Sequence, residues 1–135
     1  MVFAVIDTNV LVSAYMTHNL ESATSKVVMN LFEGKIKLLY NEEIMSEYEE
    51  VMSRAHLHIS IPEREELFAF IRRNGVLAER TTYDELFVDE SDRVFYEVTL
   101  SEEDSFLVTG NLKHYPVSPR VVTPAQMLQI LEERA

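Results

Sequence analysis

Residues 1–10 read MVFAVIDTNV, an apolar run that stops at Asp7 and is followed at once by Thr8 and Asn9. A near-continuous apolar run is typical of a strand buried in the centre of a parallel sheet. A second such run, SFLVT, occupies residues 105–109. An aspartate that closes a buried strand can cap the next helix or supply the first ligand of a metal site. The two roles are compatible, because each carboxylate oxygen has two lone-pair directions.

The alternation of short apolar runs with helical patterns predicts an α/β fold. Strands are expected over residues 2–6, 36–40, 76–80, 105–109 and 120–122, and helices over residues 10–15, 22–32, 42–54, 62–74, 91–100 and 125–134. This order favours a central parallel sheet of about five strands, covered by helices on both faces. In such sheets the functional crevice lies beyond the carboxyl ends of the strands. Asp7 and residues 109–111 both fall at such ends.

Length and composition narrow the class of protein. A chain of 135 residues predicts one domain over residues 1–135, and the absence of cysteine excludes disulfides and thiolate metal sites. The apolar stretch at residues 2–6 is too short for a signal peptide or membrane span, so we expect a cytoplasmic location and no membrane partner.

The charge is strongly acidic, with 12 basic against 23 acidic residues and a formal net charge of −11. This balance argues against tight, non-specific binding of phosphates. The acids could form a solvated surface. Several of them could also converge on divalent cations, whose charge would reverse the local field.

Two acidic segments supply further candidate residues. In NEEIMSEYEEVMSR (41–54), Glu47 and Glu49 flank the buried helix face on opposite edges, and periodicity does not separate them. In VDESDRVFYEV (88–98), Asp89, Glu90 and Asp92 lie at a helix start, where capping and the helix dipole favour acids. We expect one of these three to be a cap, whatever the others do.

Four motifs, in this order, resemble the PIN domain family: IDTNVLVSA (6–14), SEYEEVM (46–52), DESDRVFYEV (89–98) and FLVTGNLKHYP (106–116). The resemblance is to the small, single-domain prokaryotic (VapC-like) group described as toxin components of toxin–antitoxin systems. It implies a Rossmann-like three-layer α/β/α sandwich with an acidic pocket that binds Mg²⁺ or Mn²⁺. The implied activity is hydrolysis of RNA phosphodiester bonds, as an endoribonuclease. The implied partners are an RNA substrate, a protein antitoxin and a second copy of the chain in a homodimer.

Carried over by position, the resemblance makes Asp7, Glu47 and Asp92 the three catalytic acids and metal ligands. It chooses Glu47 over Glu49 because Glu47 directly precedes the tyrosine of the EY pair. Carboxylate oxygens are hard ligands that suit Mg²⁺ and Mn²⁺. Such a cation would acidify a bound water and stabilise charge on the phosphate.

The resemblance also assigns supporting roles: Thr8, Asn9 and Thr109 match polar residues that orient the acids. Many PIN domains have TGD where this chain has TGN, so Asn111 occupies a fourth ligand position with an uncharged amide oxygen. The nearest basic candidates for the RNA backbone are Lys113, His114 and Arg93.

Alternative readings remain open. A non-catalytic PIN-like module that binds a protein or RNA is suggested by Asn111 and the acidic surface. A magnesium-dependent phosphotransfer enzyme with Asp7 as nucleophile is disfavoured, since DTN lacks the second aspartate, two residues on, of haloacid dehalogenase-like phosphatases. The amphipathic helix over residues 62–74 fits either a core or an interface.

Overall fold

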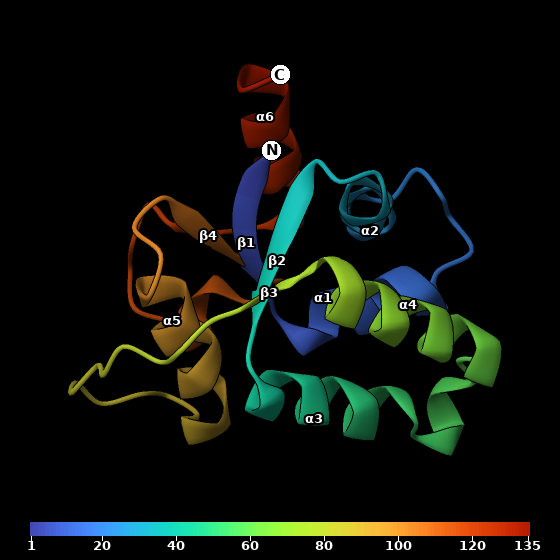
Figure 1. Cartoon of the computed structure of the whole chain (residues 1–135), viewed down its shortest axis with the longest axis horizontal. Coiled ribbons are helices and arrows are strands. Elements are labelled where there is room, and N and C mark those ends of the chain that lie inside the picture. The colour runs from blue at the N-terminus through green and yellow to red at the C-terminus, as the bar shows by residue number, and fades with distance from the viewer.

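The computed structural model describes residues 1–135 and places the first apolar run at the centre of a sheet (Figure 1). The strands are β1 (Val2–Ile6), β2 (Ile36–Tyr40), β3 (Val76–Leu77), β4 (Ser105–Val108) and β5 (Val121–Val122). The helices are α1 (Thr8–Met16), α2 (Ala23–Phe32), α3 (Glu42–Met52), α4 (Ile61–Asn74), α5 (Arg93–Leu100) and α6 (Pro124–Glu133). Single 3₁₀ turns, η1 (Ala55–Leu57), η2 (Glu90–Asp92) and η3 (Leu112–His114), lie between them. None of the helices is both long and apolar enough to span a bilayer.

The five strands are all parallel and stand in the order β3-β2-β1-β4-β5. The chain moves outward from β1 to β3 on one side, then returns to place β4 against the other side of β1. The carboxyl ends of β1 and β4 therefore flank the topological switch point, where open α/β sheets bind their ligands. Ile6 pairs with Val108, and the Asp7 amide donates to the Val108 carbonyl at 2.9 Å. Asp7 and Thr109 consequently leave the sheet side by side.

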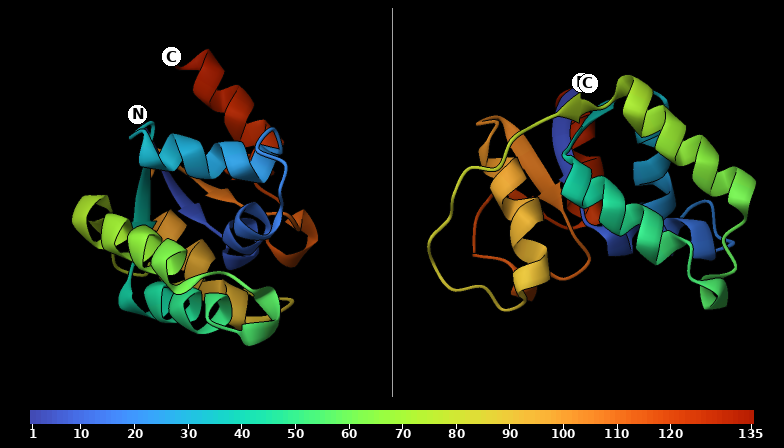
Figure 2. Two further views of the ribbon diagram at one scale, coloured as in Figure 1. Left: turned by 90° about the vertical axis from the view of Figure 1, so that its right-hand side faces the viewer. Right: turned by 60° about the horizontal axis from the view of Figure 1, so that its bottom comes forward.

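Helices cover the sheet and complete the predicted three-layer α/β/α architecture. α5 packs on β1, β2 and β4, whereas α2 packs on β2 and α6, and α3 contacts both α4 and α5. The buried apolar side chains of strands and helices form one continuous core, which includes Ile6, Tyr48 and Phe95. The segment between β3 and α5 projects from the body at the lower left of Figure 1, and it arches around α5 in the right-hand view of Figure 2. The predicted fold class is confirmed.

The expected third strand is wrong in length: it covers Val76–Leu77 instead of residues 76–80. Its partner β2 ends at Tyr40, and the last contact of the pair is the Ala78 amide to the Tyr40 carbonyl at 2.8 Å. Beyond that point no strand is available for pairing. The Thr81 amide instead donates to the Glu97 carbonyl on α5, at 3.0 Å. The other elements differ from the prediction by a few residues at their ends, where caps such as Ser22 and Asp92 lie outside the helix.

Gly75 follows α4 at a point where a side chain has no room. Its backbone is extended, but a Cβ added there would lie 2.6 Å from the Ile71 carbonyl oxygen and 2.9 Å from the Tyr40 ring. The close passage of the chain over Tyr40 brings β3 beside β2.

We therefore expect Gly75→Ala to destabilise the protein by about 2 kcal/mol, as overpacked sites do, measured as a lower midpoint of urea unfolding. Gly110→Ala is the matched control, because a Cβ at Gly110 meets nothing within 4 Å; equal midpoints for the two variants would contradict the steric account.

Candidate active site at the switch point

Asp7 follows β1 directly, and its carboxylate is buried with only 6% exposure. It caps α1, because its Oδ1 accepts from the Asn9 backbone amide at 3.3 Å. Its Oδ2 also accepts from the Thr109 hydroxyl and from the Tyr115 hydroxyl, each at 3.0 Å. A buried carboxylate is stable only when hydrogen bonds replace its water. Two hydroxyls from distant parts of the chain exceed what a helix cap requires.

Glu47 is the glutamate of α3 that faces this point. The Thr8 hydroxyl, at the start of α1, donates to Glu47 Oε2. Glu49 lies on the other edge of α3 and accepts from Arg72 on α4 at 3.2 Å. The structure thus separates the two glutamates that helical periodicity left equivalent.

Asp92 ends the 3₁₀ turn η2 directly before α5, and its side chain is 14% exposed. Its Oδ2 lies 3.2 Å from His114 Nδ1, in the turn after β4. Asp89 is the cap of this segment, since it accepts from the Ser91 amide and hydroxyl at 3.0 and 2.8 Å. The expectation that one acid here is a cap is confirmed, and Asp92 has a partner outside its own segment.

The electrostatics place Asp7 near each of the other two acids. Burial raises the pKa of the Asp92 carboxyl to about 6, charge repulsion from Asp7 and Asp89 adds to the effect, and His114 opposes it. Burial also raises the pKa of Glu47; the Thr8 hydrogen bond opposes this rise, while the charge of Asp7 adds to it. Asp7 therefore lies close enough to both carboxylates to disfavour their ionised forms.

The donor chemistry of this cluster fits a hard divalent cation. Its ligand atoms are carboxylate and hydroxyl oxygens, which suit Mg²⁺ and Mn²⁺. In Glu47 and Asp92 one oxygen is held by Thr8 or His114, while the other accepts no hydrogen bond. No three acidic or histidine side chains yet lie close enough together to hold a metal ion. Like charges repel one another. The three acids can bind one ion together only if the free oxygens of Glu47 and Asp92 turn toward the same cation.

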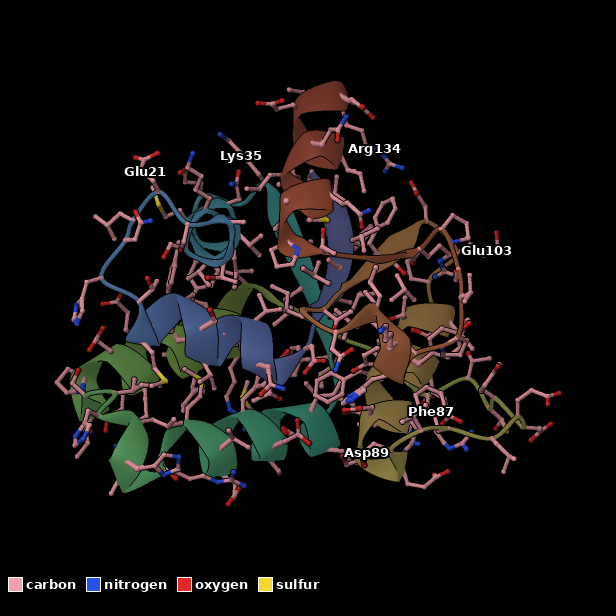
Figure 3. All side chains as sticks on the ribbon, turned by 180° about the vertical axis from the view of Figure 1, so that it is seen from behind. Glu21, Lys35, Phe87, Asp89, Glu103 and Arg134 are labelled. Atoms are coloured by element: carbon pink, nitrogen blue, oxygen red, sulfur yellow. The ribbon has the colours of Figure 1, made fainter.

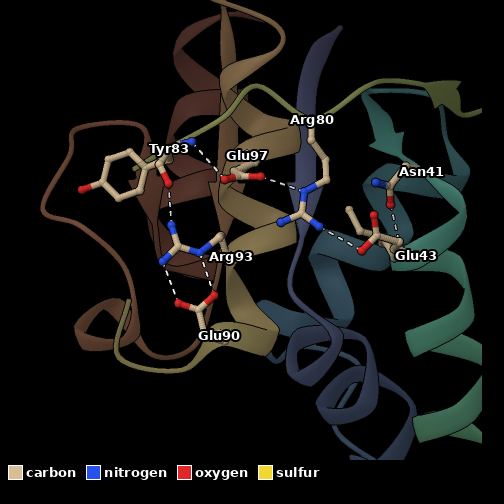
Figure 4. A network of polar contacts seen from close by, with 8 residues as sticks. Asn41, Glu43, Arg80, Tyr83, Glu90, Arg93 and Glu97 are labelled. Atoms are coloured by element: carbon tan, nitrogen blue, oxygen red, sulfur yellow. Dashed lines mark hydrogen bonds and ion pairs between the residues drawn. The ribbon is translucent and has the colours of Figure 1, made fainter. Parts of the chain in front are cut away.

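The remaining predicted site residues differ in their exposure and in the partners that their side chains and backbone contact. Asn9 contributes its backbone amide to Asp7 rather than its exposed side chain. Asn111 follows β4 and is exposed. Its backbone N–H donates to Thr109 Oγ1 at 3.0 Å. Lys113 is exposed and makes no ion pair. Arg93 is not free to hold a substrate, because its guanidinium is bound to Glu90 at 2.7 Å and to the Tyr83 carbonyl (Figure 4).

Two tyrosines contact the site, although nothing in the sequence analysis predicted that they lie there. Tyr115 is 5% exposed, and its hydroxyl is one of the two that hold Asp7. Tyr48 is fully buried, and its hydroxyl donates to the carbonyl of Ile6, the last residue of β1. The periodicity of α3 predicts Tyr48 as a core residue, but only the tertiary structure shows what its hydroxyl contacts.

Residues 4–113 match the family model of the PIN domain. The chain belongs to the PIN domain family. The match runs from β1 into the turn after β4 and so contains Asp7, Glu47, Asp92 and Asn111. No curated protein matches the chain. PIN domains are generally nucleases that use divalent metal ions, which places the acidic cluster of this PIN domain in the context of nuclease chemistry.

The raised pKa of Asp92 makes a prediction for the metal-free PIN domain. A carboxyl whose pKa rises from its usual 3.8 to about 6 on folding costs stability as pH rises through that window. In EDTA, Asp92→Asn should therefore gain on the order of 1 kcal/mol relative to wild type between pH 4.5 and pH 8, a partial effect because water still screens the carboxylate. Urea unfolding at the two pH values measures this gain. An equal difference between the proteins at both pH values would contradict it.

Proposed function

We propose that this PIN domain is a divalent-metal-dependent ribonuclease that hydrolyses RNA phosphodiester bonds. Asp7, Glu47 and Asp92 serve as its metal ligands and catalytic acids, and residues 1–135 act as one domain in the cytoplasm. One observation carries the proposal: the charge of Asp7 acts on both Glu47 and Asp92 at the switch point, and among the side chains bonded to these acids only the His114 imidazole can carry a positive charge. Buried acids that repel one another without protein cations are typical of sites that function with a bound ion.

The protein's own contribution is orientation. Thr109 and Tyr115 hold one oxygen of Asp7, Thr8 holds Glu47, and His114 holds Asp92. A bound Mg²⁺ or Mn²⁺ supplies a more acidic water and positive charge against the phosphate. Hydrogen-bond partners of metal ligands hold the ligands in the orientation that binds the ion. They contribute about 10- to 100-fold to metal affinity or activity.

The direct test is cleavage of single-stranded RNA oligonucleotides with Mn²⁺, Mg²⁺ or EDTA. Wild type should cleave only with a divalent ion, and Asp7→Asn and Glu47→Gln should lose more than the roughly 100-fold that outer partners contribute. Glu49→Gln is the matched control, since Glu49 lies on the same helix but pairs with Arg72 at the surface. Cleavage that persists in EDTA, or equal loss in Glu47→Gln and Glu49→Gln, would contradict the assignment.

A second candidate function is a PIN module that binds RNA or a protein without cutting. Asn111 favours it, because an amide in the fourth position brings no charge to a second cation. Saturable Mn²⁺ binding by wild type that both Asp7→Asn and Asp92→Asn abolish, with no cleavage of any RNA, would favour this candidate over the nuclease.

We further propose a role as the toxin component of a toxin–antitoxin system, which the sequence resemblance supports. The partners would be a protein antitoxin and a second copy of the chain. Induced expression in a bacterial host should then arrest growth, and Asp7→Asn should relieve the arrest at equal protein levels. Growth of the host expressing wild type at the rate of the Asp7→Asn strain would contradict the toxin role.

A further inference from the structure

A small cavity adjoins the acidic cluster, and its volume is about 180 Å³. Leu86, Phe87 and Val88 line it from the segment before α5, and His114, Tyr115 and Pro116 line it from the segment after β4. Two of these residues also touch the acids: Tyr115 donates to Asp7, and His114 contacts Asp92. The cavity is smaller than the roughly 300–1,000 Å³ that drug-sized ligands occupy. It therefore suits a single ring system placed next to the catalytic acids.

The segment that carries Leu86 and Val88 is firmly attached to α5. The buried Glu97 carboxylate accepts from the Tyr83 amide at 2.9 Å and from Arg80 Nε at 2.7 Å (Figure 4). Arg93 donates to the Tyr83 carbonyl from the same helix. These contacts fix the start of the projecting segment with a buried, charge-assisted network.

Aromatic packing fixes the floor of the cavity. The Phe87 ring contacts the Tyr83, Tyr96 and Tyr115 rings, with centroids 5.8–5.9 Å apart, and the Arg93 guanidinium lies 5.0 Å from its centroid. Figure 3 shows Phe87 and Asp89 alongside α5. In this anchored segment Leu86 and Val88 remain 96% and 74% exposed. Because both side chains also line the cavity, they extend it into an exposed apolar surface of the kind that binds ligands.

Charge decides what this surface can contribute to substrate binding. Single-stranded nucleic acid is held by phosphate contacts and by stacking of bases on apolar and aromatic side chains. Around this site Arg80 and Arg93 are already paired with glutamates, and His114 contacts Asp92, which leaves Lys113 as the unpaired cation. With a net charge of −11 and no bound cation, we expect phosphate contacts to supply little affinity. The bases must supply most of it.

We propose that this cavity is a nucleobase subsite, which receives an unpaired base of single-stranded RNA next to the phosphate that a cation bound by Asp7, Glu47 and Asp92 would hold. The inference rests on the proposed ribonuclease function and adds a base-binding site beside the acids. The two nucleotides joined by the scissile phosphate carry the bases nearest to it. When that phosphate lies at the acids, these bases lie on the surface that borders the acids. Only an unpaired base exposes a ring face to such a surface.

The test compares RNA strands with a base-free strand of equal charge. Fluorescein-labelled RNA dodecamers of each of the four bases, and a ribose-phosphate dodecamer without bases, are titrated with wild-type protein in EDTA and followed by fluorescence anisotropy. At least one RNA should bind about fivefold or more tightly than the abasic strand, the lower range of what one stacked base contributes. Its affinity should depend only weakly on salt, with a slope equivalent to about one or two phosphates.

A variant pair locates the subsite. Leu86→Ser/Val88→Ser should abolish the preference for RNA over the abasic strand, whereas Leu20→Ser should keep it. Leu20 is 72% exposed between α1 and α2 and does not line this cavity. If RNA is cleaved in Mn²⁺, the double variant should raise KM several-fold and leave kcat unchanged.

The outcomes separate the two proposals. Equal affinity of wild type for RNA and the abasic strand, or a preference that survives in the double variant, overturns the subsite even when RNA is cleaved. If the cavity binds a protein partner instead, the double variant should bind RNA with the same affinity as wild type. Base-dependent binding that the double variant loses, without cleavage of any RNA, supports the subsite and counts against the ribonuclease.

Discussion

The structure depends on one constraint: the carboxylate of Asp7 is buried at the point where the sheet reverses its order. It has no cation beside it, so Asn9, Thr109 and Tyr115 must supply the hydrogen bonds that replace water. Those three residues come from α1, the end of β4 and the segment after η3. Holding Asp7 therefore joins both halves of the chain at the site. None of these three bonds brings a cation to the site, and His114 opposes the charge of Asp92 alone.

The sequence predicts much of this arrangement and fails where tertiary contacts decide. The apolar run before Asp7 predicts the central strand, and the strand–helix alternation predicts the parallel sheet, because both patterns reflect burial. The third strand was predicted too long, since its end depends on where β2 stops pairing. Helical periodicity could not choose between Glu47 and Glu49, because both flank the buried face equally. Tyr115 carries no local pattern at all, and its role follows only from a contact that spans 108 residues.

The acid cluster shows a conflict between stability and chemistry. Burial and mutual repulsion raise the pKa values of Glu47 and Asp92, so the folded protein loses stability by keeping them ionised. A domain that needed only a cap and a hydrophobic core would have neutral residues there. The acidic surface has a matching consequence outside the site, where Arg80 and Arg93 are used to attach the segment before α5 rather than to hold phosphates. We therefore propose that substrate recognition rests on apolar and aromatic groups beside the acids.

We propose that Asp7, Glu47 and Asp92 share one divalent cation. Diffraction from crystals soaked in Mn²⁺, recorded at the manganese absorption edge, tests it most directly. We expect one anomalous peak between the three carboxylates, within about 2.0–2.3 Å of an oxygen from each, and its loss in Asp7→Asn crystals. A peak elsewhere, or none between these carboxylates at saturating Mn²⁺, would contradict the account and leave Asp7 as the cap of α1.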